Sequence, residues 1–353
     1  MPDDMTDGRA AMSGIGTPRR ILIVRLSALG DTALTLPLAA ALRARLPDAK
    51  IGWVVGSGSA PLVEDSPDVD RVHVMRKREG RIRETRRLAR EIRAEGYDVS
   101  LDVQGLTKSA IIPFLARVPR RIGFAKGRVE GRELSTLLAT ELVRPSDDVT
   151  HIVARQLRMG ASLGLDMPED FPVELRLEPS ALERMRTWRE ANASGGRLLV
   201  IGMGAGWPTK VIPPETAAAL AAAANNAGWR CCLLWGPAER GQLDAWREAF
   251  GSHATLAPDT DVREMTALLS LADRYAGPDS AALHIAALLG RPTFSWFGAS
   301  DPARVAPRGE GHAHVFRDMP CRPCWKRKCA SPDCVRLFSA EEMLPDFKRW
   351  LGA

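Results

Sequence analysis

Short apolar runs alternate with helical stretches along almost the whole chain, and this alternation is the strongest constraint on its fold. The predicted strands comprise residues 21–26, 51–55, 71–75, 97–103, 120–124, 198–203, 229–235, 273–276 and 292–297. Strands that alternate with helices form parallel sheets with helices on both faces. An irregular stretch near the middle divides the pattern into two series. We therefore predict an α/β fold of two Rossmann-like, doubly wound domains, with a ligand cleft between them.

The length of 353 residues suits two domains of ordinary size. The predicted order is a disordered tail (1–19), a first domain (20–178), a linker (179–196), a second domain (197–338) with a cysteine-rich loop (321–334), and a C-terminal helix (339–353). The tail is polar and lacks the apolar core of a secretory signal, and no apolar run approaches the roughly 20 residues of a membrane span. With six cysteines and no signal, the chain is expected in the reducing cytoplasm.

The segment ILIVRLSALGDTALTLP, residues 21–37, joins a buried strand to a helix through a glycine turn. In open α/β sheets, ligands bind outside the carboxyl ends of the strands, where this turn lies. Asp31 follows Gly30 directly, so its carboxylate is expected at the mouth of such a site. Aspartate is also a favoured N-cap residue. From these residues alone, helix capping and chemistry are equally good interpretations of Asp31.

The segment GPDSAALHIAALLG, residues 277–290, is a loop that enters a helix. Free backbone N–H groups and the helix dipole make such a start an anion site. Ser280 adds a hydroxyl, and His284, one turn further on, points back towards the same end. The alternative is structural, with Asp279 as the N-cap and His284 at the edge of the core. The residues alone favour neither interpretation.

A glycine-rich loop with Gly202, Gly204 and Gly206 follows another predicted strand and leads to Lys210. A flexible cation on such a loop suits a diphosphate. The loop lacks the GxxxxGK[ST] pattern of a P-loop, and its glycine spacing is not GxGxxG. The spacing therefore argues against a nicotinamide-dependent enzyme.

The net charge of +6 and the clustering of the basic residues favour an anionic partner, with nucleic acid, lipid and phosphorylated ligands as candidates. Much of the segment 76–90, RKREGRIRETRRLAR, is predicted as part of an amphipathic helix in which Ile82, Leu88, Ala89 and Ile92 fall roughly on one face. Its basic face is either a solvated surface or one that meets an anion. Both interpretations stay open.

The segment DVQGLTKSA, residues 102–110, turns at Gln104 and Gly105 before Lys108 opens a helix. A cation in the first turn opposes the helix dipole. A ligand anion would explain Lys108, whereas the alternative is an ordinary exposed lysine.

Four late cysteines have the spacing C-x2-C-x4-C-x4-C: Cys321, Cys324, Cys329 and Cys334. Four thiolates at close spacing can hold zinc or an iron–sulfur cluster. The spacing is unusual for a zinc ribbon, so reduced cysteines in a loop are the preferred interpretation and a structural metal is the alternative.

Several motifs recur in this order in glycosyltransferase family 9, the heptosyltransferases: ILIVRLSALGDTALTLP, DVQGLTKSA, GAGWPTK, LLWGPAER and GPDSAALHIAALLGRPTFSWFGASDPARVAP. The chain resembles this family from residue 21 to 307, and DVQGLTKSA is most similar to heptosyltransferase I. The resemblance implies the GT-B architecture, in which two Rossmann-like domains face a cleft, with no catalytic metal and no cofactor. It implies transfer of heptose from ADP-heptose to the Kdo–lipid A inner core of lipopolysaccharide, with inversion of the anomeric centre.

The resemblance also implies roles for particular residues. Asp31 would be the general base, which must lie within about 3 Å of the acceptor hydroxyl. Lys210 would contact the donor diphosphate, Glu239 the nucleoside ribose, and the start of the second-domain helix would offset the charge of leaving ADP. The predicted donor residues are Gly30, Lys210, Glu239, Asp279, Ser280, Ala281 and His284.

On the acceptor side, the basic segment resembles a patch that meets anionic lipid A and Kdo groups. The predicted acceptor residues are Arg76, Lys77, Arg78, Arg81, Arg83, Gln104 and Lys108. A lipid-borne acceptor implies peripheral contact with the inner face of the inner membrane. The expected partners are a nucleotide sugar and an anionic lipid-linked saccharide, with no nucleic acid and a monomeric state.

The chain departs from the family at Ser280-Ala281, where Thr-Gly is usual, and at Pro278, where a β residue is usual. The methyl group of Ala281 lies where the backbone should approach a phosphate. The cysteine-rich loop is similar to that of relatives nearer heptosyltransferase II. Two alternatives follow: a family 9 enzyme with another donor or acceptor, and a non-catalytic nucleotide- or sugar-binding protein.

Overall fold

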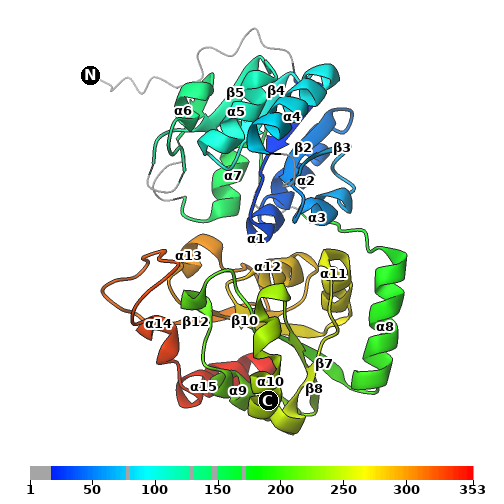
Figure 1. The fold of residues 1–353 in the computed structure, drawn as a ribbon, viewed down its shortest axis with the longest axis vertical. Coiled ribbons are helices and arrows are strands. Elements are labelled where there is room, and N and C mark those ends of the chain that lie inside the picture. The colour runs from blue at the N-terminus through cyan, green and yellow to red at the C-terminus, as the bar shows by residue number, and fades with distance from the viewer. Residues whose placement is uncertain (1–16, 77–79, 128–129, 145–148, 169–171, 353) are drawn as a thin grey trace, which may run out of the picture.

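The computed structural model describes residues 17–76, 80–127, 130–144, 149–168 and 172–352. Within this part, the chain forms two parallel six-stranded sheets, each the centre of one domain, and the domains are stacked along the long axis (Figure 1). Helices flank both sheets, as the alternating pattern predicts. The α/β prediction with two doubly wound domains is therefore confirmed.

The first domain has the strand order β3-β2-β1-β4-β5-β6. Its strands are β1 (Arg20–Val24), β2 (Lys50–Gly56), β3 (Arg71–Met75), β4 (Val99–Asp102), β5 (Arg120–Phe124) and β6 (Glu141–Val143). Its helices are α1 (Leu29–Ala33), α2 (Leu36–Arg45), α3 (Ala60–Glu64), α4 (Arg81–Glu95), α5 (Thr107–Leu115), α6 (Ser135–Leu138) and α7 (Ile152–Ala161). The order reverses between β1 and β4, and at such a switch point the strand ends leave a crevice for ligands.

The second domain has the equivalent order β12-β11-β10-β7-β8-β9. Its strands are β7 (Arg197–Gly202), β8 (Trp229–Leu234), β9 (Thr255–Leu256), β10 (Arg274–Pro278), β11 (Thr293–Phe297) and β12 (Ala313–Phe316). Its helices are α9 (Pro214–Asn226), α10 (Leu243–Phe250), α11 (Val262–Leu271), α12 (Ala281–Leu288), α13 (Pro302–Val305), α14 (Asp333–Arg336) and α15 (Ala340–Leu351). Three 3₁₀ turns are η1 (Pro208–Lys210), η2 (Pro237–Gln242) and η3 (Gly251–His253). The switch point lies between β7 and β10, where the Lys210 loop and the start of α12 meet.

The central strands form the cores. Residues 21–24 of β1 are completely buried, as are Trp53 and Phe294. Strands buried on both faces read as continuous apolar runs, which is why they were predictable from the sequence.

Several predicted boundaries need correction. The single helix expected after the glycine turn at Gly30 is two helices, α1 and α2, with a break at residues 34–35. The region predicted as a linker contains the helix α8 (Pro179–Ala193), which packs against α11. Ile82 is 70% exposed, so its assignment to the apolar face was wrong. It lies in the first turn of α4, whereas Leu88 and later apolar residues reach the sheet. Residues 1–16 of the predicted tail lie outside the described residues.

Among the described residues, the two domains contact each other at the centre and on both sides of it. Helix α1 packs against α12 at the centre, as Figure 1 shows. On one side, Arg263 of α11 contacts Glu64 at 2.8 Å and Asp65 at 3.1 Å. On the other side, Arg304 of α13 forms an ion pair with buried Glu130. The central contact, which brings the first-domain turn to the second-domain helix, is therefore flanked by charged contacts.

None of the helices in the described part of the chain is long and apolar enough to cross a bilayer.

Candidate active site

Asp31 lies in the first turn of α1 and performs the capping role that its residue type allows. Ala28 is the N-cap, and its backbone N–H donates to Asp31 Oδ2 at 3.1 Å. From the third helical position, Asp31 therefore supplies one half of a capping box, and the interpretation of Asp31 as the N-cap itself was wrong. Its side chain remains 46% exposed. Capping and chemistry are thus compatible, because one carboxylate oxygen is enough for the cap.

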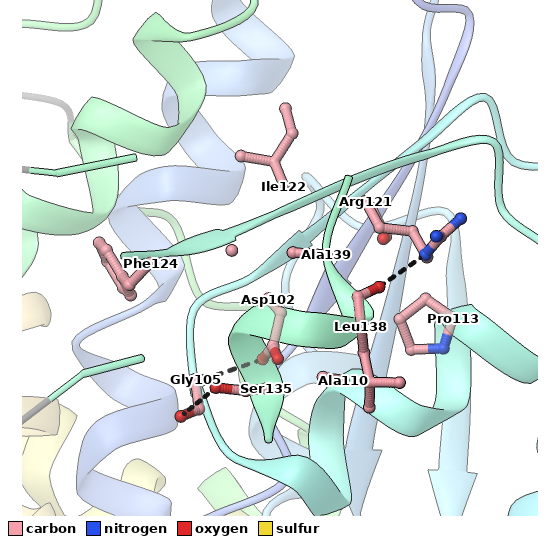
Figure 2. Close-up of a pocket in the computed structure, with 12 residues that line it drawn as sticks. Asp102, Gly105, Ala110, Pro113, Arg121, Ile122, Phe124, Ser135, Leu138 and Ala139 are labelled. Carbon is pink, nitrogen blue, oxygen red and sulfur yellow. Dashed lines mark hydrogen bonds between the residues drawn. The ribbon is translucent and has the colours of Figure 1, made fainter. Parts of the chain in front are cut away.

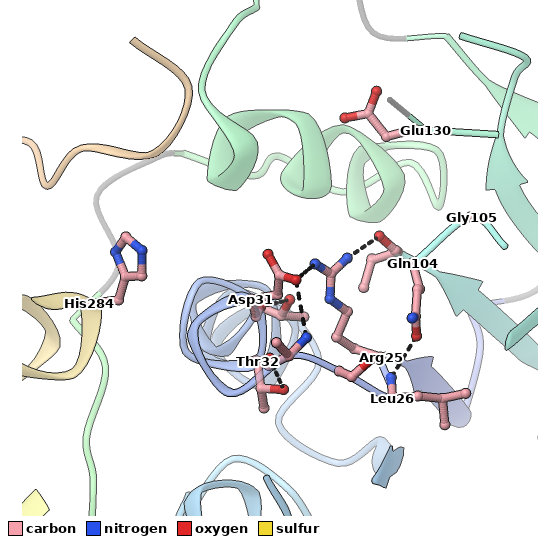
Figure 3. A network of polar contacts seen from close by, with 12 residues as sticks. Arg25, Leu26, Asp31, Thr32, Gln104, Gly105, Glu130 and His284 are labelled. Atoms are coloured by element: carbon pink, nitrogen blue, oxygen red, sulfur yellow. Dashed lines mark hydrogen bonds and ion pairs between the residues drawn. The ribbon is translucent and has the colours of Figure 1, made fainter. Parts of the chain in front are cut away.

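Arg25 forms an ion pair with the same carboxylate. It follows β1, it is buried, and its Nη2 lies 2.8 Å from Asp31 Oδ2. Its Nη1 donates to the carbonyl oxygen of Val103 at 2.9 Å. Figure 3 shows this arginine between the α1 turn and the turn that follows β4. Arg25 was not among the predicted site residues, although an arginine at the end of an apolar strand is an available signal for a buried charge partner.

The turn after β4 is ordered by Asp102. Its Oδ1 accepts hydrogen bonds from the backbone N–H groups of Gln104 and Gly105, both at 3.1 Å. Gln104 in turn accepts from the N–H of Leu26 through Oε1 at 2.8 Å. Burial raises the pKa of Asp102 to about 6, in spite of these hydrogen bonds. The turn therefore links β4 firmly to the end of β1.

A small pocket borders Asp102 inside the first domain, between β4, β5, α5 and α6 (Figure 2). Apolar groups line much of it, including Ile122, Phe124 and Leu138. It lies behind the turn at Gly105 and not between the domains. We assign it to the core of the first domain.

In the second domain, Asp279 follows β10 and lies between the side chains of Lys210 and His284. Lys210 Nζ is 2.6 Å from Asp279 Oδ2, and His284 Nε2 is 3.2 Å from Oδ1. Burial by itself would raise the pKa of Asp279, but the hydrogen bond from His284 and the charge of Lys210 outweigh it and hold that pKa well below its usual range. Asp279 is therefore ionised at neutral pH, and it fixes both partners at the start of α12.

The start of α12 presents the groups of an anion site. Ser280 is its N-cap, so the interpretation of Asp279 as the N-cap was wrong. The hydroxyl groups of Ser280 and Tyr275 lie 3.3 Å apart. His284 Nδ1 is buried and has no hydrogen-bond partner among the described residues. Free backbone N–H groups at a helix N-terminus bind phosphate readily.

Glu239 lies at the neighbouring strand end. Its Oε2 accepts from the backbone N–H of Gly236 at 2.9 Å. A methyl group on Gly204 would lie 2.4 Å from Glu239 Cδ, so the carboxylate occupies the space that this glycine leaves open. Glu239 is half-buried at the rim of the Lys210 loop.

The contact between α1 and α12 brings the two halves together. A methyl group on Gly30 would lie 3.3 Å from His284 Cδ2 and 3.4 Å from Ala281 Cα. Asp31, the next residue, therefore lies close to the predicted phosphate loop although 250 residues of sequence separate Asp31 from Ala281. Gly30 is the point where the first domain touches the start of α12.

The predicted acceptor residues are distributed over several elements. Arg81 and Arg83 are exposed in the first turn of α4, and exposed Arg76 precedes that helix. Lys108 is exposed, with Nζ 3.4 Å from Ser27 Oγ in the turn before α1. Lys77 and Arg78 lie outside the described residues. Their roles in acceptor binding stay predictions.

The structural-metal alternative for the four cysteines stays a prediction. All four are free; Cys334 is buried in α14, whereas Cys321 and Cys329 are exposed. In the described residues, no three or more His, Cys, Asp or Glu side chains are grouped so that they could hold a metal ion.

The cysteine-rich loop instead packs on the Lys210 loop. Thr209 Oγ1 donates to the carbonyl oxygen of Lys326 at 2.8 Å. The ring of Trp207 lies 4.5 Å from Lys210 Nζ and 5.2 Å from Arg327 Cζ. The loop therefore braces the segment that carries Lys210.

These features define a class of protein. Two Rossmann-like domains face each other, which is the architecture of the GT-B glycosyltransferases, with an exposed carboxylate in one and a helix N-terminus beside Lys210 in the other. The *Escherichia coli* heptosyltransferase WaaC with ADP has this fold, with a TM-score of 0.73 and 22% identity over 94% of this chain and 99% of that one.

The sequence model of glycosyltransferase family 9 (heptosyltransferase) matches residues 85–334, and the chain belongs to this family. It is 29% identical to lipopolysaccharide heptosyltransferase 1 of *Pseudomonas aeruginosa*, over 88% of this chain and 87% of the relative. It is 28% identical to lipopolysaccharide heptosyltransferase 2 of *Salmonella typhimurium*, over 82% and 85% respectively. The chain is therefore a glycosyltransferase, as its motifs predicted.

Proposed function

We propose that this enzyme transfers heptose from ADP-heptose to the Kdo–lipid A inner core of lipopolysaccharide, with inversion at the anomeric carbon and without a catalytic metal. The observation that carries the proposal is the contact between the starts of α1 and α12 at Gly30. A base and a diphosphate site must lie on opposite sides of one anomeric carbon for an inverting displacement. The relatives named lipopolysaccharide heptosyltransferase 1 and 2 support heptose as the sugar.

In this reaction, Asp31 acts as the general base. The acceptor hydroxyl oxygen attacks the anomeric carbon, its proton passes to the Asp31 carboxylate, and the bond to the ADP phosphate breaks with its electron pair. The exposed side chain of Asp31 is accessible to an acceptor. General base catalysis typically contributes about 10²–10⁴-fold to the rate.

The leaving ADP carries the developing negative charge, and the second domain supplies the opposing positive charge. Lys210 has two further N–H donors beside the one directed at Asp279, and the N–H groups of α12 add the helix dipole. Fixed donors of this kind stabilise the charge without a metal ion. Glu239 would contact the ribose of the nucleotide, as the family resemblance implies.

The acceptor side would be the basic surface of the first domain. Exposed Arg81 and Arg83 lie on α4, and such residues attract anionic lipid at about 1 kcal/mol each. We propose that the enzyme works as a monomer in the cytoplasm, on the inner face of the inner membrane, without nucleic acid.

Ser280-Ala281 favours a second candidate, a family 9 enzyme that uses a different nucleotide sugar or acceptor. The Ala281 side chain lies at the start of α12, where the family resemblance implies the approach of a phosphate. A non-catalytic binding protein is the candidate of another class. The exposed Asp31 beside the anion site argues against it.

A panel of ADP, UDP, GDP, CMP and NAD in a thermal-shift measurement tests the donor first, because a ligand of the native state raises the melting temperature. Selective stabilisation by ADP supports an ADP-sugar, and selective stabilisation by UDP or GDP rejects heptose. With the donor in hand, Asp31→Asn tests catalysis. We expect a loss of at least about 10²-fold in turnover with ADP binding retained, and an unchanged turnover would refute the role of Asp31.

A further inference from the structure

The two carboxylate oxygens of Asp31 have different surroundings. Oδ2 lies 2.8 Å from Arg25 Nη2 and 3.1 Å from the N–H of Ala28. Within the described residues, both polar contacts of this side chain go to Oδ2. Figure 3 shows the other oxygen, Oδ1, directed away from Arg25. Oδ1 is therefore the atom left for a substrate.

Arg25 is fixed at both ends. Its backbone pairs with β2, with its N–H donating to the carbonyl of Val54 at 3.1 Å and its carbonyl accepting from Trp53 Nε1 at 3.3 Å. Its guanidinium holds the carbonyl of Val103 at 2.9 Å. The residue is 8% exposed, so water screens its charge poorly.

The anchor of the guanidinium is itself ordered. Val103 begins the turn in which Asp102 accepts two backbone hydrogen bonds at 3.1 Å. A chain of fixed contacts thus leads from the buried turn after β4, through Arg25, to the exposed carboxylate of Asp31.

We propose that Arg25 is a positioning residue that occupies Asp31 Oδ2 and reserves Oδ1 as the atom that receives the proton of the acceptor hydroxyl. This inference rests on the proposed function, in which Asp31 is the general base. Arg25 neither gains nor loses a proton in the step; the proton moves from the acceptor oxygen to Oδ1 while the new glycosidic bond forms. A planar guanidinium holds two partners in one geometry, which a single ammonium group does not.

The test compares Arg25→Met and Arg25→Lys in steady-state kinetics, with ADP binding measured by calorimetry. We expect Arg25→Met to lower kcat by about 10²-fold, the usual effect of a misplaced catalytic group. Arg25→Lys keeps the charge and should recover about tenfold of that loss. ADP affinity should not change, because the donor site lies in the other domain. Such a split between kcat and binding is not expected from general unfolding.

The matched control is Arg43→Met. Arg43 also holds a carboxylate, Asp70 at 2.6 Å, and three backbone carbonyls, but it lies at the C-terminal end of α2. Its loss should leave kcat unchanged. A native kcat in folded Arg25→Met would overturn the inference. If Arg25→Met does not fold, Arg25→Lys is the deciding variant. A native kcat in Arg25→Lys would then overturn the inference.

A double-mutant cycle separates this inference from the function on which it rests. If Asp31→Asn keeps full turnover, the proposed function fails. If Asp31→Asn is impaired, adding Arg25→Met should cause no further loss of the residual turnover, because its effect passes through Asp31. A further, additive loss would mean that Arg25 acts elsewhere and would overturn the inference alone.

Discussion

Replacing Asp102 with Asn should change how the stability of the first domain depends on pH. Asp102 is 5% exposed, and its Oδ2 lies 3.0 Å from Ser109 Oγ. The same hydroxyl lies 2.8 Å from the carbonyl of Leu106, so one hydroxyl proton faces two acceptors. A protonated Asp102, or Asn, donates to Ser109 and frees its hydroxyl for Leu106. The hydrogen bonds to Asp102 favour the carboxylate, but burial outweighs them, so the folded protein favours the neutral side chain.

The magnitude follows from the raised pKa. Burial takes the pKa of Asp102 from 3.8 to about 6, which corresponds to about 3 kcal/mol between the two protonation states. Because the folded-state pKa is the higher one, this stability is fully present below pH 3.8 and is lost as pH rises through about 6. Asn has no proton to lose. From about pH 4 to about pH 8, the unfolding free energy of Asp102→Asn should therefore rise by up to about 3 kcal/mol relative to the parent.

The effect is measured by urea unfolding, followed by circular dichroism at several pH values in this range. The difference in unfolding free energy between the two proteins cancels the titration of groups that do not interact with Asp102. The control is Asp98→Asn, which removes an exposed carboxylate just before β4. A difference between parent and Asp102→Asn that does not vary with pH would refute the reasoning.

Three further predictions concern ligands. Lys210→Ala should weaken ADP binding by about 10–100-fold, the value of a hydrogen bond to a charged group, with the acceptor KM unchanged in kinetic assays. Gly204→Ala should displace the Glu239 carboxylate, from which the new methyl group would lie only 2.4 Å, and should lower ADP affinity in calorimetry by about tenfold. Replacing Arg81 and Arg83 with Gln should weaken sedimentation with anionic vesicles, by less at high salt.

Each of these has a control with the same chemical change. Lys348→Ala removes an exposed lysine from α15, and Gly206→Ala adds a methyl group to the same loop with no atom within 4 Å. The control for the Arg81 and Arg83 variant replaces Arg247 and Arg349 with Gln, which removes equal charge from the second domain. If Lys210→Ala changes only the acceptor KM, the donor site has been assigned to the wrong domain. If a variant and its control have equal effects, the proposed role of the site that the variant tests is rejected.

The sequence predicted the fold well because its strands are buried on both faces. Continuous apolar runs such as residues 198–203 are detectable without any tertiary information. Strands β6, β9 and β12 were missed because they are short edge strands of mixed polarity, such as the two-residue β9. The helix α8 was missed for another reason. It has few buried residues, and the region was interpreted only as a connection.

Candidate site residues that have a local signal in the sequence could be predicted. Roles that depend on how distant residues pack together could not. Asp31 and Lys210 follow strands in glycine-containing turns, which is a local signal. The pairing of Lys210 with Asp279 joins residues 69 positions apart, and that of Arg25 with Asp31 is set by the path of the turn. The buried state of Asp102 depends on α5 and α6 closing over it.

The ion pair of Lys210 with Asp279 has a consequence for which anions the enzyme accepts. An incoming phosphate does not meet a bare cation; it must compete with a buried carboxylate 2.6 Å from the ammonium group. A small anion that makes only one contact gains too little binding free energy to displace this carboxylate. A nucleoside diphosphate, bound at several points at once, gains enough. If Lys210 binds the donor as proposed, this arrangement should select a nucleoside diphosphate over a single inorganic phosphate.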